Sequence, residues 1–227
     1  MNANDIPAFI SYAHADRAYG GQAQKVLAEV GISAFLAHED IDVSDEWREC
    51  LLRELARCRL FVPLLSKNYL ASTWAQQEAG FIVSRLSDVV VAPLSLDGTR
   101  SGGFLAHLQS PSVRSDGITQ SLLVEPLVAR FPRTILPKLI EAARNAGSFR
   151  GAEALIAPLV RFFPLFNVAE AQAFAEAAVK NPQIWDAALC FSEYLPAFVR
   201  TQAENIRPEI LRPLVYQLEH RAWYPGD

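Results

Sequence analysis

Residues 72–81, STWAQQEAGF, place a carboxylate inside an apolar stripe. In a helix that starts at Trp74, positions 74, 78, 81 and 82 share one face, because side chains three or four apart stack together. Phe81 and Ile82 continue the apolar stripe, whereas Glu78 interrupts it. A partly desolvated carboxylate interacts more strongly with positive charge than one in water. Glu78 is therefore a candidate catalytic residue, although a glutamate at such an edge more often turns to water.

The start of this helix carries a capping signal. Thr73 and Gln76 have the spacing of a capping box, in which a hydroxyl and an amide each satisfy a backbone N–H group. We therefore expect Thr73 to cap the helix.

Composition excludes several classes of protein. With 227 residues, 51% hydrophobic and 20% charged, the chain can bury a core and is long enough for two domains. The formal charge is −4, and residues 118–227 contribute none of it, with eleven basic and eleven acidic side chains. Neither half has the basic footprint of a nucleic-acid binder, so we expect no nucleic-acid partner.

Cysteine, histidine and hydropathy patterns point to a cytoplasmic protein. Three scattered cysteines lack CxxC spacing, and four separated histidines lack ligand spacing. We therefore expect neither a disulfide framework nor a bound metal. The N-terminus lacks the pattern of a signal peptide, and VVVAPL is far shorter than the roughly 20 apolar residues of a spanning helix. No membrane association is expected.

The first half alternates short apolar runs with helical patterns, which predicts a parallel sheet covered on both faces. Gly31 should end the first helix, and Ser44 should cap the second. Pro63 and Pro93 count against central positions for their strands, because each removes a hydrogen-bond donor. The expected strands cover 8–12, 32–37, 59–66 and 89–96.

The second half is helical. Residues 98–117 are rich in Gly, Ser and Pro and are expected to form a linker, with a hidden fifth strand left open. We therefore predict two domains, 1–117 and 118–227. The expected helices cover 120–130, 134–146, 149–163, 168–180, 184–200 and 208–220.

Three segments of the second half echo one another: LVEPLV (123–128), LIAPLV (155–160) and ILRPLV (210–215). Proline in the first turn of each helix would produce this echo at little cost. A solenoid repeat and an ordinary helical bundle both remain open, since the spacing is unequal.

Residues 6–97 resemble a Toll/interleukin-1 receptor (TIR) domain of the bacterial, NAD-cleaving type. AFISYAHAD resembles the first-strand box of that family, FLAHEDIDVSDEW its mobile loop, and LFVPLLSKNYLASTW its third strand and following loop. Trp74 and Glu78 match its W-x-x-x-E arrangement. The resemblance implies an α/β fold, a flavodoxin-like parallel sheet, here followed by an all-α helical domain. It also implies cleavage of the nicotinamide–ribose bond of NAD+ in catalytic members, some of which cyclise the ADP-ribose product.

Cleavage of the nicotinamide–ribose bond requires few catalytic groups from the protein. The transition state resembles an oxocarbenium ion. Nicotinamide leaves from a cationic pyridinium and departs neutral, so no general acid is needed. One carboxylate can then stabilise the sugar as positive charge develops on it. Glu78 fits that role, and Trp74 could form a wall of the pocket or stack on a ring.

The resemblance assigns further residues to substrate binding. Ala13 and His14 follow the first strand, where family enzymes contact the dinucleotide. Asp42 lies in the mobile loop, where some members place an acidic contact; a solvated acidic loop is the alternative. Ser11 and Tyr12 lie at the carboxyl end of a strand, where open α/β sheets gather ligands.

The expected function is a TIR-domain NAD+ hydrolase that is activated by self-assembly and needs NAD+ as substrate but no cofactor. The helical domain would respond to an unknown trigger or partner, and by analogy the setting could be antiphage defence. Two alternatives stay open: a non-catalytic scaffold that acts through TIR–TIR contacts, and a nucleoside deoxyribosyltransferase-like enzyme. Many TIR domains are scaffolds, so the site must decide.

Overall fold

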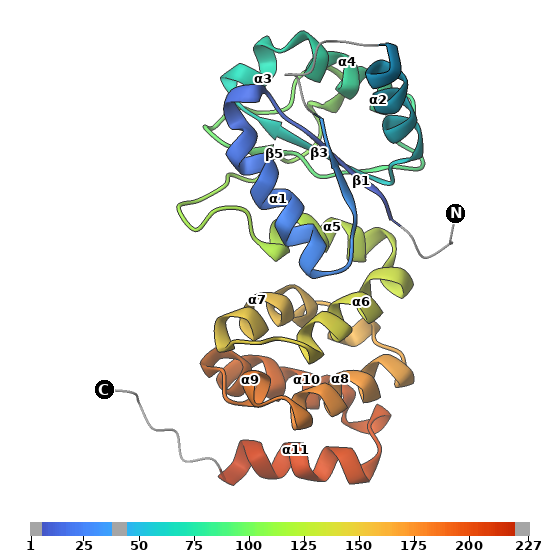
Figure 1. The fold of residues 1–227 in the computed structure, drawn as a ribbon. Coiled ribbons are helices and arrows are strands. Elements are labelled where there is room, and N and C mark those ends of the chain that lie inside the picture. Colours follow the sequence, from blue (N-terminus) through green and yellow to red (C-terminus); the bar gives the residue numbers. More distant parts are fainter. Residues whose placement is uncertain (1–5, 38–44, 221–227) are drawn as a thin grey trace. The chain divides into compact units, whose positions relative to one another are not determined.

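The computed structural model describes residues 6–37 and 45–220 (Figure 1). Contacts divide the chain into two compact units, Met1–Arg130 and Phe131–Asp227. The division falls later than the predicted boundary at 117/118, because helix α5 (Gln120–Arg130) packs on α1 (Arg17–Glu29) and belongs with the sheet.

The first unit contains the predicted parallel sheet. Its strands follow the order β2-β1-β3-β4, with β5 also paired to β3 and every pairing parallel. This confirms the α/β prediction, because helices connect β1 to β2, β2 to β3 and β3 to β4 (Figure 1). The strands are β1 (Ala8–Ser11), β2 (Ala34–Leu36), β3 (Leu60–Leu65), β4 (Val90–Val91) and β5 (Leu94–Ser95).

Two prolines interrupt the sheet at the same level. The predicted strand 89–96 is split by Pro93 into β4 and β5, which pair with β3 in one common register. That register places Pro63 of β3 opposite Pro93, so both missing N–H donors fall at the same point of the ladder. Pro63 nevertheless lies inside a central strand, so the expectation that it would avoid such a position is wrong.

Residues 98–117 do not form a further strand of the sheet; they contribute a single isolated β-bridge to it. Ser112 pairs in parallel with Ser95 at the end of β5. Ser95 N donates to Pro111 O at 2.9 Å, and Val113 N donates to Ser95 O at 2.8 Å. Both distances are typical of backbone hydrogen bonds. The segment therefore extends the sheet by one bridge at its edge.

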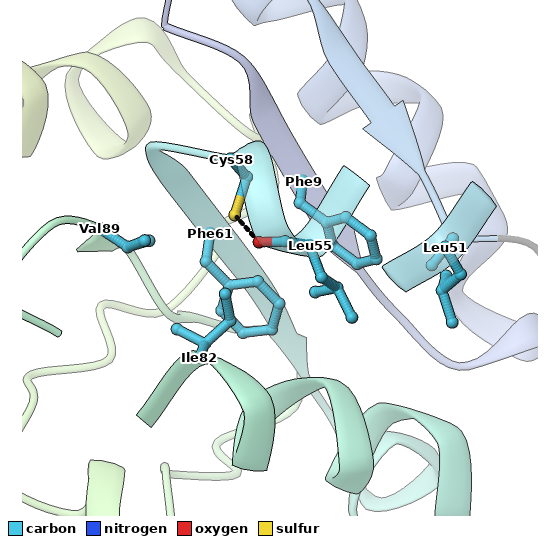
Figure 2. Packing of buried hydrophobic residues seen from close by; sticks show 8 residues of the cluster. Phe9, Leu51, Leu55, Cys58, Phe61, Ile82 and Val89 are labelled. Atoms are coloured by element: carbon cyan, nitrogen blue, oxygen red, sulfur yellow. Dashed lines mark hydrogen bonds between the residues drawn. The ribbon is translucent and has the colours of Figure 1, made fainter. Parts of the chain in front are cut away.

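Aromatic side chains from three neighbouring strands pack together on one face of the sheet. Phe9 of β1 lies with its ring centroid 5.4 Å from that of Phe35 and 5.9 Å from that of Phe61. Helices α2 (Asp45–Arg57) and α4 (Thr73–Val83) cover this face. Figure 2 shows the rings of Phe9 and Phe61 beside apolar side chains from both helices, among them Leu55 of α2 and Ile82 of α4. Because side chains alternate along a strand, Ser11 lies on the same face as Phe9 and so faces these helices.

The second unit is a two-layer stack of helices. In one layer α6 packs on α8 and α8 packs on α11; in the other, α7 packs on α9 and on the π-helix that leads into α10. The stacking favours the solenoid alternative over a closed bundle. The predicted helix 184–200 is divided among three of these elements. The elements are α6 (Pro132–Arg144), α7 (Phe149–Val160), α8 (Val168–Lys180), α9 (Pro182–Trp185), the π-helix (Cys190–Tyr194), α10 (Leu195–Gln202) and α11 (Pro208–His220).

The echoed prolines do not start helices, which corrects the prediction. Pro126, Pro158 and Pro213 lie inside α5, α7 and α11. Different prolines, Pro132 and Pro182, occupy the first turns of α6 and α9. An internal proline removes one backbone hydrogen bond and crowds the preceding turn. Tertiary packing offsets that cost at Pro158, which is buried, whereas Pro213 is exposed.

Four phenylalanines form the centre of the second unit. Phe163, Phe166, Phe174 and Phe198 contact one another in every pair, with ring centroids 4.6 Å apart for Phe174 and Phe198 and 6.2 Å apart for Phe166 and Phe198. Most of the pairs are edge-to-face, which aromatic quadrupoles favour. Gln202 Nε2 donates to Phe163 O at 2.6 Å and so satisfies a buried carbonyl beside the rings.

Phe174→Ala should lower the free energy of unfolding by about 4 kcal/mol, because it removes a buried ring from this cluster and leaves a cavity. Urea unfolding followed by circular dichroism measures the loss. Phe149→Ala is the matched control: its ring is 49% exposed, so the expected cost is below about 1 kcal/mol. Equal costs for the two variants would contradict the assigned core.

The three cysteines should differ in reactivity. Burial raises the pKa of Cys58 to about 11 and that of Cys190 to about 12, whereas Cys50 is half-buried. Because the thiolate is the reactive form, only Cys50 should react rapidly with Ellman's reagent at pH 8. Cys50→Ser should remove that fast phase, and denaturant should expose the other two thiols. A second fast thiol in the native protein would contradict this.

Candidate active site

The corner between α3 (Lys67–Ala71) and α4 fixes the start of the helix that carries Glu78. Ser72 is extended at this corner and caps α4 by accepting a hydrogen bond from Ala75 N at 3.1 Å. Gln76 Nε2 instead donates to Tyr69 O at 3.1 Å. The predicted capping box with Thr73 is therefore wrong by one residue, because α3 ends immediately before Ser72 and leaves that residue as the cap.

Glu78 turns inward from α4. Its side chain is only 4% exposed, and Ser11 Oγ donates to Glu78 Oε2 at 2.5 Å. Ser11 is fully buried at the carboxyl end of β1. The apolar stripe is thus interrupted by a carboxylate that meets a hydroxyl donor on the sheet rather than water. This hydrogen bond orients the carboxylate.

Tyr69 is a third member of this polar cluster, and the sequence did not single it out. Its Oη lies 3.2 Å from Ser11 Oγ and donates to Ala75 O at 3.4 Å. Burial raises the pKa of Tyr69 well above its ordinary value, and the charge of Glu78 raises it further. Tyr69 therefore stays a neutral hydroxyl. Its sequence signals were its place three residues after the predicted third strand and its position within the segment LFVPLLSKNYLASTW.

A second carboxylate–serine pair lies at the next strand end. Ser66, at the end of β3, donates from Oγ to Asp16 Oδ2 at 2.5 Å and accepts from Tyr69 N at 3.0 Å. Ser66 is the N-cap of α3, and both partners are buried. The pair ties the loop after β1 to the corner that leads into α4.

Trp74 packs into the core on the α2 side. Its ring lies edge-on to that of Trp47, with centroids 5.3 Å apart, and contacts the apolar cluster of Figure 2. The half-buried indole thus helps to fix α4 against α2. A contact between Trp74 and a substrate ring stays a prediction.

The remaining predicted site residues occupy different environments. Tyr12 is buried, and its ring lies 3.1 Å from the point where a Cβ at position 20 would sit, so Gly20 provides its space. Ala13 is buried, whereas His14 is exposed at the start of a short 3₁₀ turn. Asp42 lies outside the described residues. Of the predicted binding residues, Ser11 is hydrogen-bonded to Glu78.

A family model described as TIR domain matches residues 8–122, half of the chain. The chain belongs to the TIR domain family. The match covers all five strands, both carboxylate–serine pairs and α4, so the whole candidate site lies within the TIR domain. A search of curated proteins returned no match.

Within the described residues, no cluster of three or more His, Cys, Asp or Glu side chains could hold a metal ion. Over the same ranges, no helix combines the length and the apolar character needed to cross a membrane.

Ser66→Ala should lower the free energy of unfolding by about 2 kcal/mol, because it removes the cap of α3 and a charge-assisted bond to a buried carboxylate. Urea unfolding gives the measurement. Ser84→Ala is the control: that exposed hydroxyl donates only to Phe81 O, and its loss should cost less than about 0.5 kcal/mol. A neutral Ser66→Ala would contradict the assigned pair.

Proposed function

We propose that this TIR domain hydrolyses NAD+ at the nicotinamide–ribose bond and that Glu78 is its catalytic residue. The observation that carries the proposal is the environment of Glu78: a carboxylate, 4% exposed, held by a hydroxyl donor at the carboxyl end of a parallel sheet. Ligands of open α/β sheets gather at that edge. A buried carboxylate in such a position is a candidate for a functional site.

Cleavage of the nicotinamide–ribose bond requires one negative charge close to the sugar. As nicotinamide departs, positive charge develops on the ribose ring, and a preorganised carboxylate stabilises it without having to reorganise water. Nicotinamide needs no proton to leave, so Glu78 can act without a second acid. The products are nicotinamide and ADP-ribose, or a cyclic ADP-ribose if a ribose or adenine atom attacks in place of water.

The other predicted binding residues take supporting roles in this proposal. His14, exposed after β1, would contact a phosphate, and Ala13 would offer its backbone. Trp74 would present a ring edge to the dinucleotide, and Asp42 would contact the substrate from the loop. Tyr12 would support the strand end by packing on α1 at Gly20.

Burial of Glu78 supports control by assembly. Because Glu78 is only 4% exposed, a sugar can reach it only after the residues that cover it rearrange, while Ser11 keeps the carboxylate oriented. We propose that self-association of TIR domains provides that rearrangement, so that activity rises with protein concentration. The helical unit would then oligomerise the chain or receive a trigger. Such gating suits an enzyme that consumes a central metabolite, and antiphage defence is the setting that the family suggests.

The test is release of nicotinamide from NAD+ by concentrated full-length protein, assayed over a range of protein concentrations. Glu78→Ala should lower the rate by roughly 10²-fold or more, as loss of a transition-state charge does. Glu49→Gln is the matched control, since this exposed acid on α2 lies outside the proposed site and its loss should leave the rate unchanged.

The same assay with a nucleoside in place of NAD+ separates the alternatives. Base exchange on the nucleoside, with NAD+ untouched, would identify a deoxyribosyltransferase-like enzyme. Absence of turnover of both compounds at every protein concentration would identify a scaffold. Unchanged NAD+ cleavage in Glu78→Ala would remove Glu78 from the mechanism.

A further inference from the structure

Two hydroxyl groups connect Glu78 to the rest of the TIR domain. Ser11 Oγ, on β1, lies 2.5 Å from Glu78 Oε2 and 3.2 Å from Tyr69 Oη. A serine hydroxyl carries one proton, and the shorter bond to a carboxylate takes it. Tyr69 in turn donates to Ala75 O, one turn before Glu78 on α4. The carboxylate is therefore held from the sheet, and its helix is held from α3.

We propose that Ser11 and Tyr69 are positioning residues that aim the Glu78 carboxylate at the substrate sugar. The assignment rests on the proposed function for Glu78 and changes the role expected of Ser11, from contacting substrate to orienting the acid. Ser11 is fully buried and already bonded to Glu78, which suits a residue that acts through another.

The chemistry of the contact supports this role. A carboxylate can accept about four hydrogen bonds, so the bond from Ser11 fixes its direction without using its capacity. Ser11 sits on a central strand that pairs with β2 and β3 on its two sides, so its backbone is rigid. Displacement of a catalytic group by about 1 Å can cost on the order of 10²-fold in rate.

Tyr69 adds a second anchor from a different element. Its backbone N–H is bonded to Ser66, its carbonyl accepts from Gln76, and its hydroxyl reaches α4. The raised pKa of Tyr69 keeps that hydroxyl protonated through the working range of pH. The corner and the first turn of α4 are therefore tied together through one side chain.

Steady-state kinetics on NAD+ with the full-length protein test the positioning role. Ser11→Ala should lower kcat by roughly ten- to a hundredfold, as expected for loss of a bond to a charged group, with KM within about twofold of wild type. Tyr69→Phe should lower kcat a few-fold. A raised KM with unchanged kcat in Ser11→Ala would overturn the proposal and make Ser11 a substrate contact.

Ser11→Cys separates orientation from space filling. The thiol occupies similar space but is a weak donor, so kcat should remain near that of Ser11→Ala. Recovery of wild-type kcat in Ser11→Cys would show that volume alone matters and would overturn the proposal.

A double-mutant cycle on stability tests the bond without any catalysis. The loss in urea midpoint caused by Ser11→Ala should shrink by at least half in a Glu78→Ala background, because the partner is already gone. Strictly additive losses would overturn the proposal. If the wild-type protein did not cleave NAD+, the proposed function would fail while this cycle still reported on the contact.

Discussion

A buried carboxylate needs a donor, and in this TIR domain the donor comes from the sheet. Glu78 lies under the aromatic face, where a charge without a partner would cost several kcal/mol. Ser11 provides the hydrogen bond from the end of β1. That requirement links three features: a small hydroxyl residue at the last position of a central strand, a helix capped by Ser72, and a corner between α3 and α4 that places Glu78 beside that strand.

The same kind of hydrogen bond, from a serine hydroxyl to a buried carboxylate, occurs at the ends of two neighbouring strands. Ser11 holds Glu78, and Ser66, at the end of the neighbouring strand, holds Asp16. Tyr69 contacts both serines, one through its hydroxyl and one through its backbone N–H. The two pairs are therefore coupled through a single residue on α3. Such a network is rigid when every member is satisfied, which suits an edge that must hold an acid in place.

The helical unit owes its stability to different forces. Its core is a cluster of four phenylalanine rings, and its helices tolerate internal prolines where packing compensates for the lost hydrogen bonds. Neighbouring helices stack in two layers, so each pair buries its apolar face on the next. Glu78, Ser11 and Tyr69 all belong to the TIR domain, and in the proposed function the helical unit serves regulation.

Local patterns predicted the parallel sheet, the helices of both units and the spacing that singles out Glu78, because periodicity reports which faces are buried. They could not show that Ser72 caps α4, since several hydroxyl residues compete at that corner and only the end of α3 selects one. The matched prolines at positions 63 and 93 depend on strand register, which no single segment contains. The direction of the Glu78 side chain was likewise decided by tertiary structure. Burial becomes favourable only once Ser11, 67 positions away in the sequence, is brought within hydrogen-bonding distance.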